Sequence, residues 1–260
     1  MSAAETVAKL RLIRSENIGP VTYRQLVMRF GNAVAAVDAL PDLARRGGRN
    51  FRIATIDEAE AEIAAITGFG GQLLFIGSDF YPHLLAHSET APPVLAVKGD
   101  VALLERPAVA IVGARNASGA GTRFARELAA GLAAAELVVV SGLARGIDTA
   151  AHWGALEGGT IGVIAGGLDI PYPPEVADLQ TQIGERGLIV AEQPFGTQPQ
   201  ARHFPRRNRI IAALAAGTVV VEGALKSGSL ITARIAAEAG REVMAVPGSP
   251  LDPRAQGCNQ

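Results

Sequence analysis

Arginine side chains are concentrated in one short segment that leads into an apolar run with helical spacing. The segment from Arg202 to Arg209 holds four arginines and no acid, and it also contains Phe204 and Pro205. Guanidinium groups form paired hydrogen bonds to phosphate oxygens, and aromatic rings among basic residues are typical of single-strand contacts. The alternative is a solvated basic loop. The polyanion site predicted here contains Arg202, His203, Phe204, Arg207, Asn208 and Arg209.

Three glycine-containing loops offer free backbone N–H groups of the kind that hold anions. Each loop follows a predicted apolar strand and leads into a predicted helix, whose N-terminus stabilises negative charge. Each loop alone would also serve as an ordinary tight turn. Their coincidence with the arginine segment favours an extended anionic ligand. The residues assigned to these loops are Gly113, Arg115 and Ser118, then Ser141, Gly142, Arg145 and Gly146, and finally Lys226, Ser227, Gly228 and Ser229.

The elements that must position these loops alternate between strand and helix from residue 108 onward. Short, continuously apolar strands separated by amphipathic helices indicate a parallel sheet covered on both faces. Right-handed crossovers then give a Rossmann-like, doubly wound α/β fold, which binds ligands at the carboxyl ends of its strands. The predicted strands are residues 108–112, 137–140, 160–165, 188–191, 218–222 and 242–246.

The N-terminal quarter of the chain has a different pattern. In residues 1–66, apolar side chains recur at helical spacing around a turn at Asn17–Thr22. This pattern predicts a small helical domain of the SAM or helix-hairpin-helix type. Such a module could grip a DNA backbone or could pack without a ligand, and the sequence leaves both open. Residues 67–107 are predicted to be a linker with a short strand at 94–98, and residues 108–260 the Rossmann-like DNA-binding domain.

Composition excludes several classes of protein. The sequence contains no apolar run of membrane-spanning length, so no membrane association is expected. Cys258 is the only cysteine, which excludes a disulfide framework and a cysteine-based zinc site and favours the cytoplasm. The net charge of −1 gives no support for a nucleic-acid partner by itself. Such binding depends on basic residues clustered on one face.

The loops do not match the common nucleotide or catalytic motifs. A dinucleotide fingerprint needs G-x-G-x-x-G after the first strand and an acid after the second, whereas the second predicted strand ends at Ser141-Gly142. We therefore predict no cofactor. Asp148 and His152 share a helix face and could serve acid–base or metal chemistry. We favour a structural role, in which Asp148 offsets the helix dipole and His152 packs on the sheet.

Five ordered motifs together resemble the DNA processing protein A family, also called DprA or Smf, over about residues 5–260. These motifs are residues 111–118, 141–152, 204–211, 221–233 and 246–248. The resemblance implies a non-enzymatic protein of natural transformation that binds and protects incoming single-stranded DNA. It also implies help in loading the RecA recombinase, and a homodimer formed through the Rossmann-like domain.

The resemblance also assigns roles to particular residues. It implies that Arg115 and the basic residues of the arginine segment hold phosphates, and that Phe204 contacts a base. A family lysine before this aromatic is replaced here by Ala201 and Arg202, of which Arg202 is the expected substitute. The family pattern continues beyond Gln260 into a last Rossmann segment, and many members add a winged-helix-like domain.

One enzyme class with the same type of sheet is the alternative. Nucleotide phosphoribohydrolases of the lysine-decarboxylase-like group carry P-G-G-x-G-T-x-x-E, with a catalytic acid on the helix. The corresponding turn here, residues 225–232, lacks that acid. Release of ribose from a nucleotide would distinguish this alternative from a DNA-binding protein.

Overall fold

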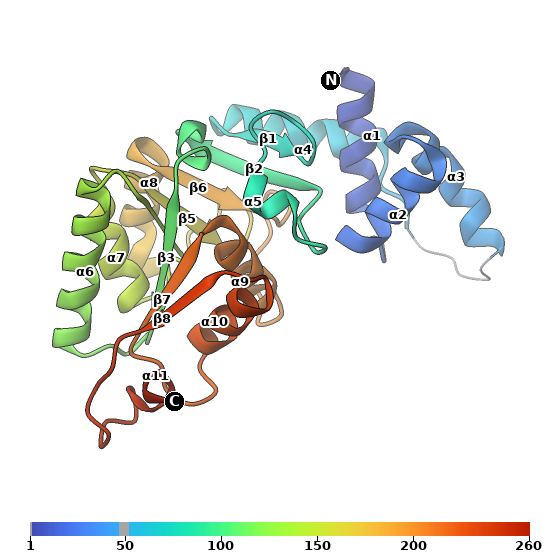
Figure 1. The fold of residues 1–260 in the computed structure, drawn as a ribbon. Coiled ribbons are helices and arrows are strands. Elements are labelled where there is room, and N and C mark those ends of the chain that lie inside the picture. The colour runs from blue at the N-terminus through green and yellow to red at the C-terminus, as the bar shows by residue number, and fades with distance from the viewer. Residues whose placement is uncertain (1, 47–51) are drawn as a thin grey trace.

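The computed structural model describes residues 2–46 and 52–260 (Figure 1). Its N-terminal part is helical, as predicted, and its side chains pack around Leu12, Tyr23 and Leu40. Helix α4 begins with a reciprocal capping box, in which Thr55 and Glu58 each accept a backbone N–H from the other. The helices of this part are α1 (Ala3–Arg14), α2 (Pro20–Phe30), α3 (Ala33–Arg46) and α4 (Ile56–Gly68).

The larger part of the molecule is built on one sheet. Within the described residues the sheet has eight strands in the order β1-β2-β6-β5-β4-β3-β7-β8, and β3 to β8 are parallel. This confirms the α/β, Rossmann-like prediction. The strands are β1 (Gln72–Phe75), β2 (Val94–Gly99), β3 (Ala108–Gly113), β4 (Val138–Ser141), β5 (Thr160–Ile164), β6 (Leu188–Ala191), β7 (Gly217–Val221) and β8 (Glu242–Ala245).

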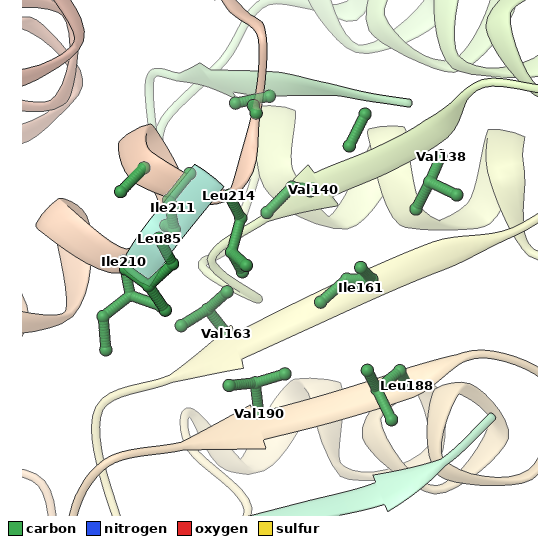
Figure 2. Close-up of a cluster of buried hydrophobic side chains, with 14 of the residues drawn as sticks. Leu85, Val138, Val140, Ile161, Val163, Leu188, Val190, Ile210, Ile211 and Leu214 are labelled. Atoms are coloured by element: carbon green, nitrogen blue, oxygen red, sulfur yellow. The ribbon is translucent and has the colours of Figure 1, made fainter. Parts of the chain in front are cut away.

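Longer helices cover both faces of this sheet, because alternate residues of a strand point to opposite faces. In β4, Val139 packs with residues of α6 and α7, whereas Val138 and Val140 pack with α9. Figure 2 shows the second of these faces, where Ile210, Ile211 and Leu214 approach the strands. The helices are α6 (Gly119–Ala134), α7 (Ile147–Ala155), α8 (Ala177–Arg186), α9 (His203–Leu214) and α10 (Gly228–Glu238).

The strand order reverses beside β3. The chain proceeds from β3 through β4 and β5 to β6 in one direction, and α9 then returns it to β7 on the other side of β3. Doubly wound sheets bind ligands at such a switch point, because two neighbouring connections leave in opposite directions and open a crevice. The carboxyl ends of β3 and β7 are therefore the place to look for a site.

Residues 67–107 differ from the predicted linker. Strand β2 pairs antiparallel with β6, and β1 pairs antiparallel with β2, so this segment extends the main sheet. The segment also carries the short helices α5 (His83–Ala86) and η1 (Val101–Leu104), and Tyr81 donates a 2.6 Å hydrogen bond to the Pro92 carbonyl. The strand predicted at 94–98 corresponds to β2, whereas β1 and the pairing of both strands with the main sheet were not predicted. No described helix is long and apolar enough to span a bilayer.

Candidate nucleic-acid interface

Two adjoining hollows lie at the carboxyl edge of the parallel strands, and we call them together the groove. The switch hollow, of about 420 Å³, lies between the loop after β3, helix α9 and the start of α10. The proline hollow, of about 270 Å³, lies between the loop after β4 and the segment 170–175. Arg115, Ala144, Phe204 and Arg207 line both hollows, so the two are continuous.

Phe204 stands at the junction of the two hollows. Its ring is half-buried, and the guanidinium carbon of Arg115 lies 5.3 Å from the ring centroid. The ring of Tyr172 lies on another side, with a centroid distance of 5.6 Å. Tyr172 is a lining residue that the sequence pattern did not predict. Its place as an aromatic among the prolines of residues 171–174 is the sequence signal that could have identified it.

Exposed cations surround the groove. Arg115 and Arg145 are exposed and line it. Arg145 lies 3.9 Å from the Glu175 carboxylate, but both side chains are more than half exposed, so this pair contributes little stability. Arg202 is exposed immediately before α9, beside the groove rather than in its described lining. Lys226 is exposed near the switch hollow with a positive φ of 63°.

Arg207, in contrast, is buried in the floor of the groove. Its Nη1 donates to the carbonyl oxygens of Gly142 and Val163, the latter at 2.6 Å. The carboxylate of Asp148 accepts the N–H groups of Gly142 and Ala144 at 3.2 and 3.3 Å. A side chain at Gly142 would lie within 3 Å of both charged groups, so glycine is required there.

Burial shifts the pKa values of the titratable groups in and behind this floor. It lowers the pKa of Arg207 to about 10, which still leaves the guanidinium charged at neutral pH. It raises the pKa of Asp148, against the opposing effects of Arg207 and of the two backbone N–H groups. His152, behind this pair, shares a 2.8 Å hydrogen bond with Thr160, and burial lowers its pKa to about 3. Asp148 and His152 thus occupy structural positions, as favoured from the sequence.

Other residues of the arginine segment also have partners inside the protein. Arg209 forms an ion pair with Glu192 and donates to the Thr90 carbonyl at 2.5 Å, which ties α9 to the end of β6. His203 is buried, and its Nδ1 accepts the Gln200 N–H at 3.3 Å. Burial and the nearby arginines lower the pKa of His203, which favours the neutral imidazole. Asn208 donates to the Gly228 carbonyl at 3.3 Å and lines the switch hollow.

The residues of the glycine loops also fall into two groups: some line the groove, and others have partners inside the protein. Gly113, Ser227, Gly228 and Ser229 line the switch hollow, and Gly142 lines the proline hollow. The Ser141 hydroxyl, by contrast, is buried and donates to the Ile111 carbonyl at 2.6 Å. Ser141 thus joins the neighbouring strands β3 and β4 and does not face a ligand.

Two assigned residues at helix starts also serve the fold directly. Gly146 precedes α7 with a positive φ of 78°, a conformation that glycine adopts without strain. Ser118 caps α6 and is hydrogen-bonded to Glu222. Among the loop residues assigned from the sequence, these two and Ser141 therefore support the fold rather than line the groove.

The described residues contain no cluster of three or more histidine, cysteine, aspartate or glutamate side chains placed to hold a metal ion. The groove offers a ligand exposed guanidinium and ammonium groups, backbone N–H groups at the start of α10, and the aromatic rings of Phe204 and Tyr172. These suit phosphates and bases along a flexible strand.

Comparison with known proteins gives consistent family matches. Residues 72–260 match the family described as DNA recombination-mediator protein A, and residues 3–65 match the DprA-like N-terminal HHH domain. DNA processing protein DprA of Streptococcus pneumoniae is 49% identical over 183 residues, which cover 70% of this chain and 64% of that protein. The putative DprA of Mycobacterium tuberculosis is 40% identical over 259 residues, covering 93% of this chain and 64% of that protein. The chain thus spans just under two thirds of these relatives' length.

Solved structures agree. The X-ray structure of DprA from S. pneumoniae has a TM-score of 0.75 and 40% identity, with 93% of this chain and 91% of that chain covered. DNA processing protein A from Helicobacter pylori, solved for its single-stranded DNA binding mode, has a TM-score of 0.66 and 30% identity, with 72% and 86% covered. These matches confirm the family predicted from the five motifs. The chain belongs to the DNA processing protein A family, also called DprA or Smf.

Proposed function

We propose that this protein binds single-stranded DNA in the groove, with little dependence on sequence, and acts as a recombination mediator rather than as an enzyme. The observation that carries the proposal is the placement of Phe204 between two hollows with the Arg115 guanidinium beside its ring. A base that stacks on an aromatic ring must be free of its complementary strand, so this arrangement favours single strands over duplex.

The path of the strand follows from the exposed charges. Phosphates would contact Arg115, Arg145 and Lys226 and the N–H groups at the start of α10, while bases turn toward Phe204 and Tyr172. Phosphate contacts of this kind position a strand without reading its sequence. The single-stranded DNA binding of the H. pylori relative supports single-strand binding as the function of the groove.

The cellular part of the proposal rests on the family. By that resemblance the protein works as a homodimer in the cytoplasm, protects incoming strands during transformation and helps load RecA on them. The test is whether the purified protein accelerates assembly of RecA filaments on single strands precoated with a single-strand binding protein. No acceleration at saturating protein would remove the loading role and leave the binding role standing.

Binding itself is tested by titrating labelled oligonucleotides of equal length, single-stranded and duplex, across a salt series. Binding of the single strand should be tighter and should weaken steeply with salt, because each neutralised phosphate releases counterions. Arg115→Ala should cost roughly 1.5–3 kcal/mol of affinity, the value of a charge-assisted hydrogen bond. Arg123→Ala, which removes an exposed arginine of α6, is the matched control. Equal affinity for the duplex would contradict the proposal.

A further inference from the structure

Two helices begin after neighbouring strands at the switch point, and their N-termini differ. Helix α6 follows β3 and helix α10 follows β7, and these two strands are neighbours in the sheet. Each N-terminus carries free N–H groups and a partial positive charge that attract an anion. In a dinucleotide-binding sheet of this type, the helix after the first strand holds the pyrophosphate.

At α6 that position is already filled by a carboxylate of the protein. Glu222, the residue after β7, accepts the Ser118 N–H at 2.8 Å with one carboxylate oxygen and the Ser118 hydroxyl with the other. The Ser118 hydroxyl oxygen in turn accepts the Gly121 N–H at 2.9 Å. The carboxylate is thus held in place by the same kinds of donors that a phosphate would use.

The surrounding backbone is adapted to this carboxylate. A β-carbon at Gly121 would lie 2.6 to 3.0 Å from the carboxylate carbon and oxygens of Glu222, so a glycine is needed for the side chain to enter. Glu222 itself has a positive φ of 55°, an uncommon conformation for a residue other than glycine. Both features cost conformational free energy and are explained by the placement of this one carboxylate.

At α10 the corresponding position is open. Ser227, which precedes the helix, makes no capping bond with its side chain in the described chain. Its hydroxyl instead lies 2.8 Å from that of Ser229, and both residues line the switch hollow. The positive N-terminus of α6 is therefore neutralised by the Glu222 carboxylate, whereas the N-terminus of α10 faces the groove.

We propose that Glu222 determines which anions the switch point accepts. Its carboxylate occupies the phosphate position at α6, which excludes a diphosphate or nucleotide from the first loop and leaves α10 to receive the phosphates of the strand. The assignment of α10 to the phosphates of the strand rests on the proposed single-strand binding. The exclusion of anions from α6 by Glu222 does not depend on it.

The experiment measures backbone amide signals by ¹H–¹⁵N NMR while inorganic pyrophosphate is added. In the unmodified protein, pyrophosphate should shift the amides of residues 228–230 and leave those of residues 119–121 unchanged. In Glu222→Gln, which keeps an oxygen acceptor for Ser118 but removes the charge, both sets should shift. Glu127→Gln removes an exposed acid farther along α6 and should behave as the unmodified protein does.

A second arm measures single-stranded DNA. Glu222→Gln should lower the dissociation constant at low salt by about threefold to tenfold, as expected for removing a like charge near a helix N-terminus. Shifts at residues 119–121 in the unmodified protein, or none there in Glu222→Gln, would overturn the proposal. If the unmodified protein binds no single-stranded DNA, the proposed function fails, while the pyrophosphate result still decides the role of Glu222.

Discussion

The floor and the rim of the groove are built from the same residue type and behave differently. The rim contains Arg115, Arg145 and Arg202, whose guanidinium groups are exposed to solvent. The floor contains Arg207, which is only 6% exposed and donates to the carbonyl oxygens of Gly142, in the loop after β4, and of Val163, in β5. A charge in the rim is available to a ligand, whereas the charge in the floor is bonded through its Nη1 to the protein itself.

This difference shows that the arginine segment has two roles. Burying a guanidinium costs several kcal/mol unless it is compensated. Arg207 is compensated through the two Nη1 hydrogen bonds to backbone carbonyls and through attraction to the Asp148 carboxylate, while its buried Nε has no hydrogen-bond partner among the described residues. The hydrogen bond from Arg207 to Gly142 joins α9, which carries Phe204, to the loop that carries Arg145. The floor therefore fixes the positions from which the rim and the aromatic ring would contact DNA.

The largest expected effect is on the floor. Arg207→Ala should reduce the free energy of unfolding by roughly 3–5 kcal/mol, because Asp148 would remain buried without its cation. Chemical denaturation monitored by circular dichroism measures this change. The control is Arg206→Ala, at the neighbouring exposed position. A surface change of this kind should alter stability by less than about 0.5 kcal/mol.

A double variant distinguishes the electrostatic effect of Arg207 on Asp148 from the loss of side-chain packing. Arg207→Met combined with Asp148→Leu removes both charges and should be less destabilised than Arg207→Met alone, since no unpaired carboxylate remains. If Arg207→Ala keeps full stability and loses only DNA affinity, Arg207 belongs functionally to the rim, and the division between floor and rim is wrong.

The next effect concerns the ring at the junction. Phe204→Ala should weaken single-strand binding by about 1–3 kcal/mol, the usual value of a lost base stack. The slope of affinity against salt should stay nearly unchanged, because no charge is removed. Phe124→Ala removes an aromatic of α6, which is 42% exposed, and should leave affinity unchanged. A lowered melting temperature with intact binding would identify Phe204 as a packing residue.

The floor also predicts a dependence of stability on pH. Burial lowers the pKa of His152 to about 3 from 6.5, so the unfolded chain takes up the proton first as the pH falls. Stability should therefore be lost progressively as the pH drops below 6.5. By proton linkage, this residue alone should remove about 2 kcal/mol by roughly pH 5. His152→Asn should flatten this part of the curve of unfolding free energy against pH. An unchanged slope would place the titration elsewhere.

The fold could be predicted from the sequence because each parallel strand is a short, continuously apolar run, and β6 was located at its observed bounds, 188–191. The strand predicted at 94–98 is β2, but its antiparallel pairing with β6 was not predicted, and the four-residue edge strand β1 was missed because so short a strand has no distinct pattern. The glycine loops and the arginine segment lie together at one edge of the sheet, as the order of strands and helices predicted.

The roles of individual arginines could not be predicted. The consecutive residues Arg206 and Arg207 point in different directions from the first turn of α9, and only the packing of that turn decides which one is buried. The pairing of Ser118 with Glu222 joins residues 104 positions apart in the chain, so no local spacing reveals it. Sequence patterns locate a site by its loops, whereas burial decides which of its charges are free.

The smallest expected effect concerns Arg202, which lies at the outer edge of the rim. Arg202 is exposed just before α9, beside the groove, and the resemblance to the family predicts that it substitutes for a basic residue before the aromatic. Arg202→Ala should leave stability unchanged and reduce the slope of log affinity against log salt by about one, the signature of one lost phosphate contact. Arg186→Ala, an exposed arginine at the end of α8, is the control and should leave the slope unchanged. If Arg202→Ala also leaves the slope unchanged while Arg115→Ala lowers it, the strand contacts only the cations that line the two hollows, and the rim ends at the groove itself.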